Sequence, residues 1–143
     1  MIPSEKQEQN LLAKWLDLAV GPYGWAHPVN EGKRKRGAQA KQAGMKAGLP
    51  DALIFARPRG EPTPARVLRG HVQPSAFRGV ALELKRADGG TGLSPEQALW
   101  FRALQFNGWH VILACGAEQA VEKLQALGFG VGIPLALAAE RRG

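Results

Sequence analysis

Three side chains near the middle of the chain are of the types that support metal-assisted attack of water on a phosphate ester. Asp51 follows Pro50 at the start of a short apolar run, and Glu83 and Lys85 lie two residues apart in a second apolar run. Hard cations such as Mg²⁺ take oxygen ligands, typically one or two carboxylates with water and substrate phosphates. A lysine beside such an ion can position or deprotonate the attacking water. The three residues therefore indicate phosphodiester hydrolysis.

The order and spacing of these residues make the signal more specific than any one of them. Pro50 and Asp51 are followed by thirty-one residues and then by Glu83-Leu84-Lys85, which is the order of the PD-(D/E)xK signature. Taken alone, an Asp after Pro is most often a turn former, and a Glu and Lys two apart on a strand most often lie on a solvated face. The apolar residues around both halves favour a joint site.

The elements that must position these side chains follow from the hydrophobic pattern. Residues 81–85 alternate with period two, so Glu83 and Lys85 project from one face of a strand and the leucines beside them from the other. Short apolar runs predict further strands over 51–56 and 109–115. If the strands over 51–56 and 79–85 pair, two carboxylates and one ammonium group converge.

Helix signals surround these strands. Ser4 and Gln7 form a capping box for an amphipathic helix over 4–20, and Ser94 with Pro95 starts a helix that runs to about Gln105. The other expected segments are a short strand within 24–30, a loop or poor helix over 33–48, a long hairpin connection over 57–78, a helix over 117–127 and an edge strand or loosely attached tail over 129–137. This order predicts an α/β domain with a small mixed sheet flanked by helices.

The charge of the chain is concentrated in one segment. The chain carries a net +7, and residues 33–78 hold eleven Lys and Arg against two acidic residues, a local +9. Such a one-sided run beside a metal motif favours a surface that follows a phosphate backbone, although charge runs are usually solvated loops. The candidate DNA-binding residues are Lys33, Arg34, Lys35, Arg36, Lys41, Lys46 and, more weakly, Asn30 and His27.

Length and composition exclude several classes. The 143 residues suffice for a single domain spanning 1–143. One cysteine, Cys115, cannot form an intramolecular disulfide, and the sequence shows neither a secretion signal nor a membrane span. We therefore expect a soluble, cytoplasmic protein that does not contact a membrane.

Five segments together resemble the virus-type replication-repair nuclease (VRR-NUC) family, a branch of the PD-(D/E)xK nucleases often found in phage and prophage genomes. The segments are HPVNEGK (27–33), GMKAGLPD (44–51), ALELKR (81–86), LSPEQ (93–97) and GWHV (108–111). The resemblance covers about residues 4–127 and leaves 128–143 as a C-terminal tail or edge strand. It implies a PD-(D/E)xK restriction-endonuclease-like fold.

The resemblance also implies a set of site residues. Carried over position by position, they are Glu5, Asp51, Glu83, Lys85 and Gln97, with Asp51, Glu83 and Glu5 holding Mg²⁺ or Mn²⁺. Two alternatives stay open at this point. Glu8 competes with Glu5 for the place on the first helix, where Glu5 could instead complement the helix dipole, and Gln97 could be an ordinary first-turn residue.

The function that the resemblance implies is a metal-dependent DNA endonuclease of phage or prophage DNA replication or repair. Stand-alone members of this length resemble dimeric Holliday-junction resolvases, so branched DNA and a homodimer are expected. The alternatives are a flap-trimming or nicking nuclease and a non-catalytic DNA-binding module on the same fold. The intact set of Asp51, Glu83 and Lys85 argues against the non-catalytic module.

Overall fold

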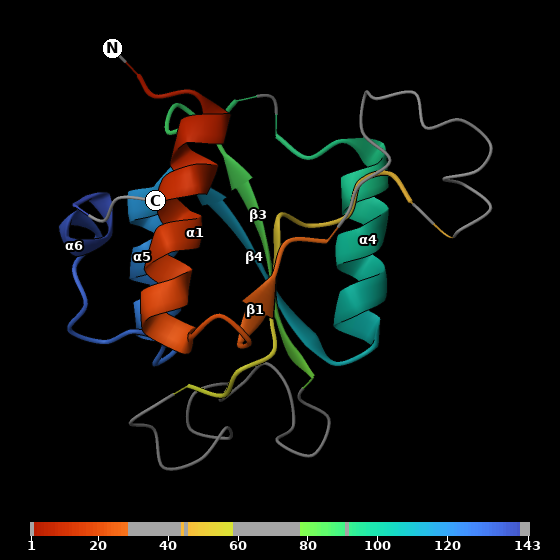
Figure 1. The fold of residues 1–143 in the computed structure, drawn as a ribbon. Helices are drawn as coiled ribbons and strands as arrows, with labels where there is room; N and C mark the ends of the chain where they lie inside the picture. The colour runs from red at the N-terminus through yellow and green to blue at the C-terminus, as the bar shows by residue number, and fades with distance from the viewer. Residues whose placement is uncertain (1, 29–43, 45, 59–77, 91, 141–143) are drawn as a thin grey trace.

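The chain folds into a four-stranded sheet with helices on both faces, as a computed structural model shows (Figure 1). The structure describes residues 2–28, 44, 46–58, 78–90 and 92–140. Along the chain the elements are α1 (Glu5–Val20), β1 (Trp25–Ala26), β2 (Ala52–Ile54), β3 (Gly79–Lys85), α4 (Pro95–Phe106), β4 (Trp109–Cys115), α5 (Ala117–Ala126) and α6 (Leu135–Ala139).

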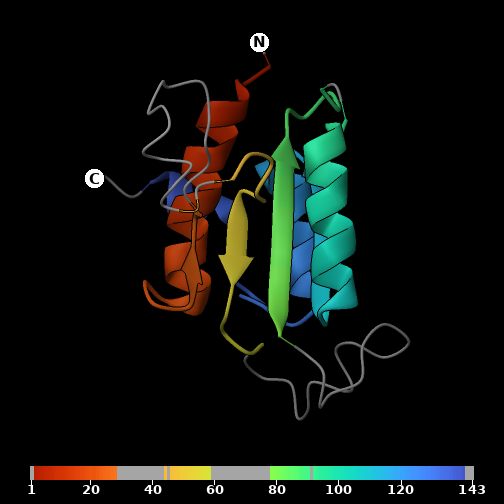
Figure 2. The same ribbon diagram turned by 90° about the vertical axis from the view of Figure 1, so that its right-hand side faces the viewer.

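The sheet is mixed, with the strand order β1-β2-β3-β4. β1 pairs with β2, and β2 with β3, in antiparallel fashion, whereas β3 and β4 run parallel. α4 makes the crossover between the two parallel strands and lies on one face of the sheet, while α1 and α5 cover the other face (Figures 1 and 2). The predicted α/β class with a small mixed sheet between helices is therefore confirmed.

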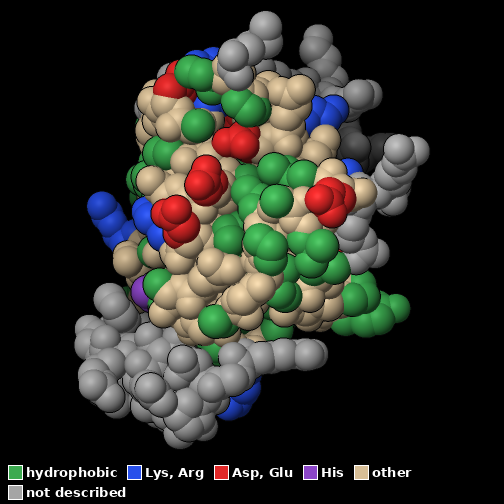
Figure 3. All heavy atoms as spheres, turned by 90° about the vertical axis from the view of Figure 1, so that its left-hand side faces the viewer, with side chains coloured by type: hydrophobic (Ala, Val, Ile, Leu, Met, Phe, Trp, Pro, Cys, Tyr) green, Lys and Arg blue, Asp and Glu red, His purple; other side chains and the backbone are tan. Residues whose placement is uncertain are grey.

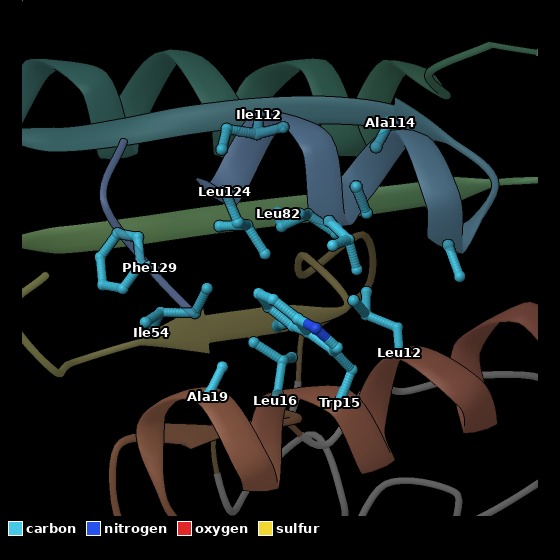
Figure 4. Packing of buried hydrophobic residues seen from close by; sticks show 14 of the residues in the cluster. Leu12, Trp15, Leu16, Ala19, Ile54, Leu82, Ile112, Ala114, Leu124 and Phe129 are labelled. Atoms are coloured by element: carbon cyan, nitrogen blue, oxygen red, sulfur yellow. The ribbon is translucent and has the colours of Figure 1, made fainter. Parts of the chain in front are cut away.

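The apolar core lies between the sheet and the pair α1 and α5 (Figure 4). α1 turns its apolar stripe inward, and Trp15 at its centre is fully buried. The indole nitrogen of Trp15 donates to the carbonyl of Ile133 at 2.9 Å, so the most buried aromatic also has its polar group satisfied. α1 starts at the predicted capping box, in which Ser4 and Gln7 bond reciprocally.

The expectation of an edge strand or loosely attached tail over 129–137 is wrong. Phe129 is 1% exposed and belongs to the core, and α6 packs against α1. The amide of Gln125 donates to the carbonyls of Gly130 and Ile133, both at 3.0 Å, which holds the connection in place. On the face of the molecule that carries α5 and α6, apolar side chains are exposed next to acidic side chains (Figure 3).

The predicted strand over 79–85 and helix over 117–127 agree with β3 and α5, and the strand within 24–30 is the two-residue β1. Most of 33–48 and 57–78 lies outside the described residues. No helix in the described part of the chain is long and apolar enough to cross a membrane.

Candidate active site

Pairing of β2 with β3 brings the two halves of the sequence signature together. Ala52 is opposite Leu82 in the antiparallel register, so Asp51 lies one residue beyond this pair, beside Glu83. The Oδ2 atom of Asp51 accepts a hydrogen bond from the backbone N–H of Leu84 at 2.7 Å. Because this bond ties the side chain to β3, the Asp51 carboxylate is held at the C-terminal end of that strand.

Gln97 completes the cluster from the first turn of α4. Its Nε2 donates to Glu83 Oε2 at 3.0 Å, and its Oε1 accepts from Lys85 Nζ at 3.0 Å. The same Oε1 accepts from the backbone N–H of Ser94 at 2.9 Å, and Ser94 Oγ accepts from the Gln97 N–H at 3.1 Å. Gln97 is thus both the capping-box residue of α4 and a hydrogen-bond partner of Glu83 and Lys85, and the capping box sets the orientation of its amide.

Glu83 and Lys85 are buried charged side chains, 2% and 7% exposed. Lys85 Nζ lies 3.6 Å from Glu83 Oε2. Burial is the main cause that raises the pKa of Glu83 to about 8, followed by the negative charge of Asp51, while the ammonium of Lys85 acts in the opposite direction. Perturbed carboxyl groups of this kind concentrate at functional sites.

The oxygen atoms at this end of β3 fit a divalent cation. The Oε1 atom of Glu83 is buried and has no hydrogen-bond partner within the described part of the chain, which is costly unless a ligand or ion satisfies it. With Asp51 alongside, two carboxylates face one place, the number that Mg²⁺ usually takes from a protein. Among the described residues no three His, Cys, Asp or Glu side chains form a metal-binding group.

The two candidate carboxylates of α1 have different surroundings. Glu5 is exposed and close enough for its charge to contribute to the raised pKa of Glu83. Glu8 is buried, and its Oε2 lies 3.3 Å from the backbone N–H of Ala117, at the N-terminus of α5. This placement favours Glu5 as the α1 carboxylate nearer the site, and it gives Glu8 a helix-capping contact instead.

Two further side chains lie beside Asp51: Gln9, and His27, which was predicted only as a weak DNA-binding candidate. Gln9 Nε2 donates to Asp51 Oδ1 at 3.3 Å, so both carboxylate oxygens of Asp51 have donors. His27 Nδ1 lies 2.6 Å from the Asp51 carbonyl oxygen and 3.2 Å from Gln9 Nε2. A hydrogen bond to the Asp51 carbonyl requires a proton on His27 Nδ1, because a carbonyl oxygen only accepts. The spacing of Gln9 four residues after Glu5 places both side chains on one face of α1, but it does not identify Asp51 as a partner.

Gly48 explains how the segment before Asp51 can pass so close to α4. Its φ is +81°, and a Cβ atom there would lie 2.6 Å from Cβ of Glu96. Trp100 on α4 donates from its indole nitrogen to the carbonyl of Ala47 at 2.9 Å. The glycine and this bond hold the 46–51 segment against the helix that carries Gln97.

Of the predicted DNA-binding residues, the structure places Lys46, which is exposed beside α4. The others lie outside the described residues: Lys33, Arg34, Lys35, Arg36, Lys41 and Asn30.

Comparison with known proteins finds a similar structure but no similar sequence. By sequence, the chain matches no family model and no curated protein. By structure, it is similar to a solved "VRR_NUC domain protein", with a TM-score of 0.62 and 21% identity over 87% of this chain and 88% of that one. The chain therefore has the fold of a VRR-NUC domain, as the sequence resemblance predicted.

Proposed function

We propose that the protein is a metal-dependent DNA endonuclease. The observation that carries this proposal is the meeting of Asp51, Glu83, Lys85 and Gln97 at one end of β3, on a fold similar to that of a VRR_NUC domain protein. Two acidic groups and one ammonium group held together by hydrogen bonds suit hydrolysis of a phosphodiester better than a purely structural role, because burying unneeded charges is unfavourable.

In this proposal Asp51 and Glu83 hold Mg²⁺ or Mn²⁺, and Glu5 contributes through a water molecule. The bound ion would polarise the phosphoryl oxygen and lower the pKa of the attacking water. Glu83 Oε1, which has no hydrogen-bond partner within the described part of the chain, is the natural ligand atom. Asp51 keeps its carboxylate in place through the N–H of Leu84 and the amide of Gln9.

Lys85 and Gln97 act on the reacting groups. One N–H of the Lys85 ammonium donates to Gln97 Oε1, which leaves two for the attacking water or a phosphoryl oxygen. Stabilising negative charge as it develops on the phosphoryl oxygens lowers the barrier, because these donors are already oriented. Gln97 holds Lys85 and Glu83 at once, and so fixes the distance between the ammonium group and the carboxylate.

DNA is the proposed substrate, and branched DNA is favoured through the VRR-NUC resemblance. The net charge of +7, concentrated as +9 within 33–78, supports a polyanionic partner. A homodimer would supply two cutting sites for the two strands of a junction. Light scattering of the purified protein, with and without DNA, would measure the oligomeric state.

The enzymatic proposal is tested with labelled four-way junction, flap and duplex DNA in Mg²⁺, Mn²⁺ or a chelator. Wild type is expected to cut with the metals and not with the chelator, and Asp51→Asn and Lys85→Met are expected to be inactive. Asp88→Asn is the matched control, since Asp88 is an acidic residue near the end of β3 that pairs with Arg86 outside the site. Binding without cutting by wild type would instead support the non-catalytic module.

A further inference from the structure

A groove of about 880 Å³ runs along α1 and reaches Asp51. Glu5 and Asp51 are part of its lining, as are Trp25 of β1 and His27, which follows β1 closely in the chain. The volume is within the range of small-ligand sites, about 300–1,000 Å³. The groove is therefore large enough for a nucleoside and shares its lining with the candidate active site.

The lining of the groove combines an apolar interior with polar groups. Leu12 and Leu16 contribute the apolar part from α1, and Trp25 adds an aromatic ring. The indole nitrogen of Trp25 donates to Asp17 Oδ1 at 2.8 Å, which fixes the orientation of the ring. Polar groups come from Gln9, Asn10 and His27. An aromatic wall with amide and imidazole groups is suited to the flat face and polar edge of a nucleobase.

We propose that this groove receives the base of an unpaired nucleotide next to the phosphodiester that is cut. The inference rests on the proposed function, because it takes the scissile phosphate to lie at Asp51. A nucleoside is attached on each side of that phosphate, and the groove is the space along α1 whose lining includes Asp51. Lys6, also in the lining, supplies a positive charge for the adjoining backbone.

The proposal narrows the substrate class. A base stacked inside a duplex must be extruded before it can enter such a groove, and this cost is smallest for a base that is already unpaired. Flaps and splayed ends offer an unpaired nucleotide beside the cut, whereas the arms of an ideal four-way junction are fully paired. The groove therefore favours flap or splayed DNA over junctions and continuous duplexes.

The test measures binding, so that it does not depend on turnover. The fluorescent base analogue 2-aminopurine is placed at the unpaired nucleotide next to a flap junction, or at the same position in a continuous duplex, and titrated with protein in a chelator. Stacking in the groove is expected to change the fluorescence of the flap probe only. Substitution Trp25→Leu is expected to reduce that change, because it removes the aromatic wall.

Groove-filling variants test the location. Ala13→Phe, at a half-buried lining position, and Asn10→Trp, at an exposed one, are expected to weaken flap binding about tenfold and duplex binding by less than about twofold. Asn10→Trp keeps the test valid if Ala13→Phe fails to fold. Ala103→Phe is the matched control, because Ala103 lines a different groove on α4.

The outcomes separate this inference from the proposed function. Equal binding of flap and duplex, or equal weakening of both by the filling variants, would overturn the groove assignment even if the protein cuts DNA. Selective loss of flap binding in each filling variant that folds would support the groove even if wild type cuts nothing, in which case the endonuclease proposal alone fails.

Discussion

Both faces of β3 are buried, but one face is apolar and the other carries charged side chains. Val80, Leu82 and Leu84 enter the core under α1 and α5, whereas Glu83 and Lys85 on the other face meet the first turn of α4. All seven residues of the strand are buried. Burial therefore does not distinguish the apolar face from the charged one.

The two faces differ in the interactions that compensate for the burial of their side chains. Apolar side chains need only close packing, but buried charges need hydrogen-bonding partners. Gln97 supplies a hydrogen-bonding partner to both charged side chains. The capping box of α4 directs its Oε1 toward Lys85 and its Nε2 toward Glu83. The remaining atom, Glu83 Oε1, is buried and has no hydrogen-bond partner among the described residues.

The largest expected effect is a loss of DNA cleavage when a residue on the charged face of β3 is replaced. Lys85→Met replaces the ammonium with an apolar chain of similar length and is expected to lower the cleavage rate about 100- to 1,000-fold. The free energy of unfolding should change little at pH 7, because Glu83, with its raised pKa, can stay protonated when its cation is removed. Single-turnover cleavage and urea unfolding measure the two quantities; unfolding of Lys85→Met at 25 °C would contradict the division between the faces.

The apolar face is expected to behave in the opposite way. Leu82 is fully buried in the core, so Leu82→Ala should lower the free energy of unfolding by about 2–5 kcal/mol through lost burial and a residual cavity. Below its melting temperature the folded variant should cut DNA at a rate near wild type. A loss of cleavage as large as that of Lys85→Met, in protein shown to be folded, would mean that the two faces are not independent.

The charged face should also make stability depend on pH. The pKa of Glu83 rises from 4.5 to about 8 on folding, so the folded state holds a proton that the unfolded state releases between these values. In metal-free protein the free energy of unfolding is therefore expected to fall as pH rises from about 5 to 8, and to level off above. Urea unfolding in a chelator at several pH values measures this, and Glu83→Gln should lack the decline if Glu83 causes it.

Local signals made most of the fold predictable from sequence. The alternation over 79–85 marked β3 and assigned its two faces, and the capping motifs at Ser4 and Ser94 placed the starts of α1 and α4. The strand pairing that unites Asp51 with Glu83 was a conditional prediction, and the register confirms it. These features depend on residues close together in the sequence, or on the single pairing of β2 with β3.

Features that depend on distant contacts were not predictable. Gln9 and His27 meet Asp51 across 42 and 24 positions of sequence, and no local pattern encodes either contact. Residues 135–139, LALAA, are apolar throughout and carry no alternation that would mark a strand. They form α6, in agreement with the high helix propensity of Ala and Leu, and α6 packs against α1.

The smallest expected effects separate the two glutamates of α1. The apolar stripe predicts that Glu8 points inward, and it does, but its carboxylate meets the N-terminus of α5. Glu8→Gln should therefore lower the free energy of unfolding by about 0.5–2 kcal/mol, through loss of a charge at a helix N-terminus, and leave cleavage nearly intact. Glu5→Gln should change stability by less than about 0.5 kcal/mol.

Glu5→Gln is instead expected to reduce cleavage about tenfold, the effect of removing a residue that supports a metal ion through water. Raising the Mn²⁺ concentration should restore part of the rate, because weaker ion binding is compensated by mass action. If Glu8→Gln were the variant that lost cleavage and recovered with Mn²⁺, the α1 carboxylate of the site would be Glu8. Its bond to Ala117 would then have to break when the ion binds, so that the core side of α1 and the charged face of β3 would share one residue.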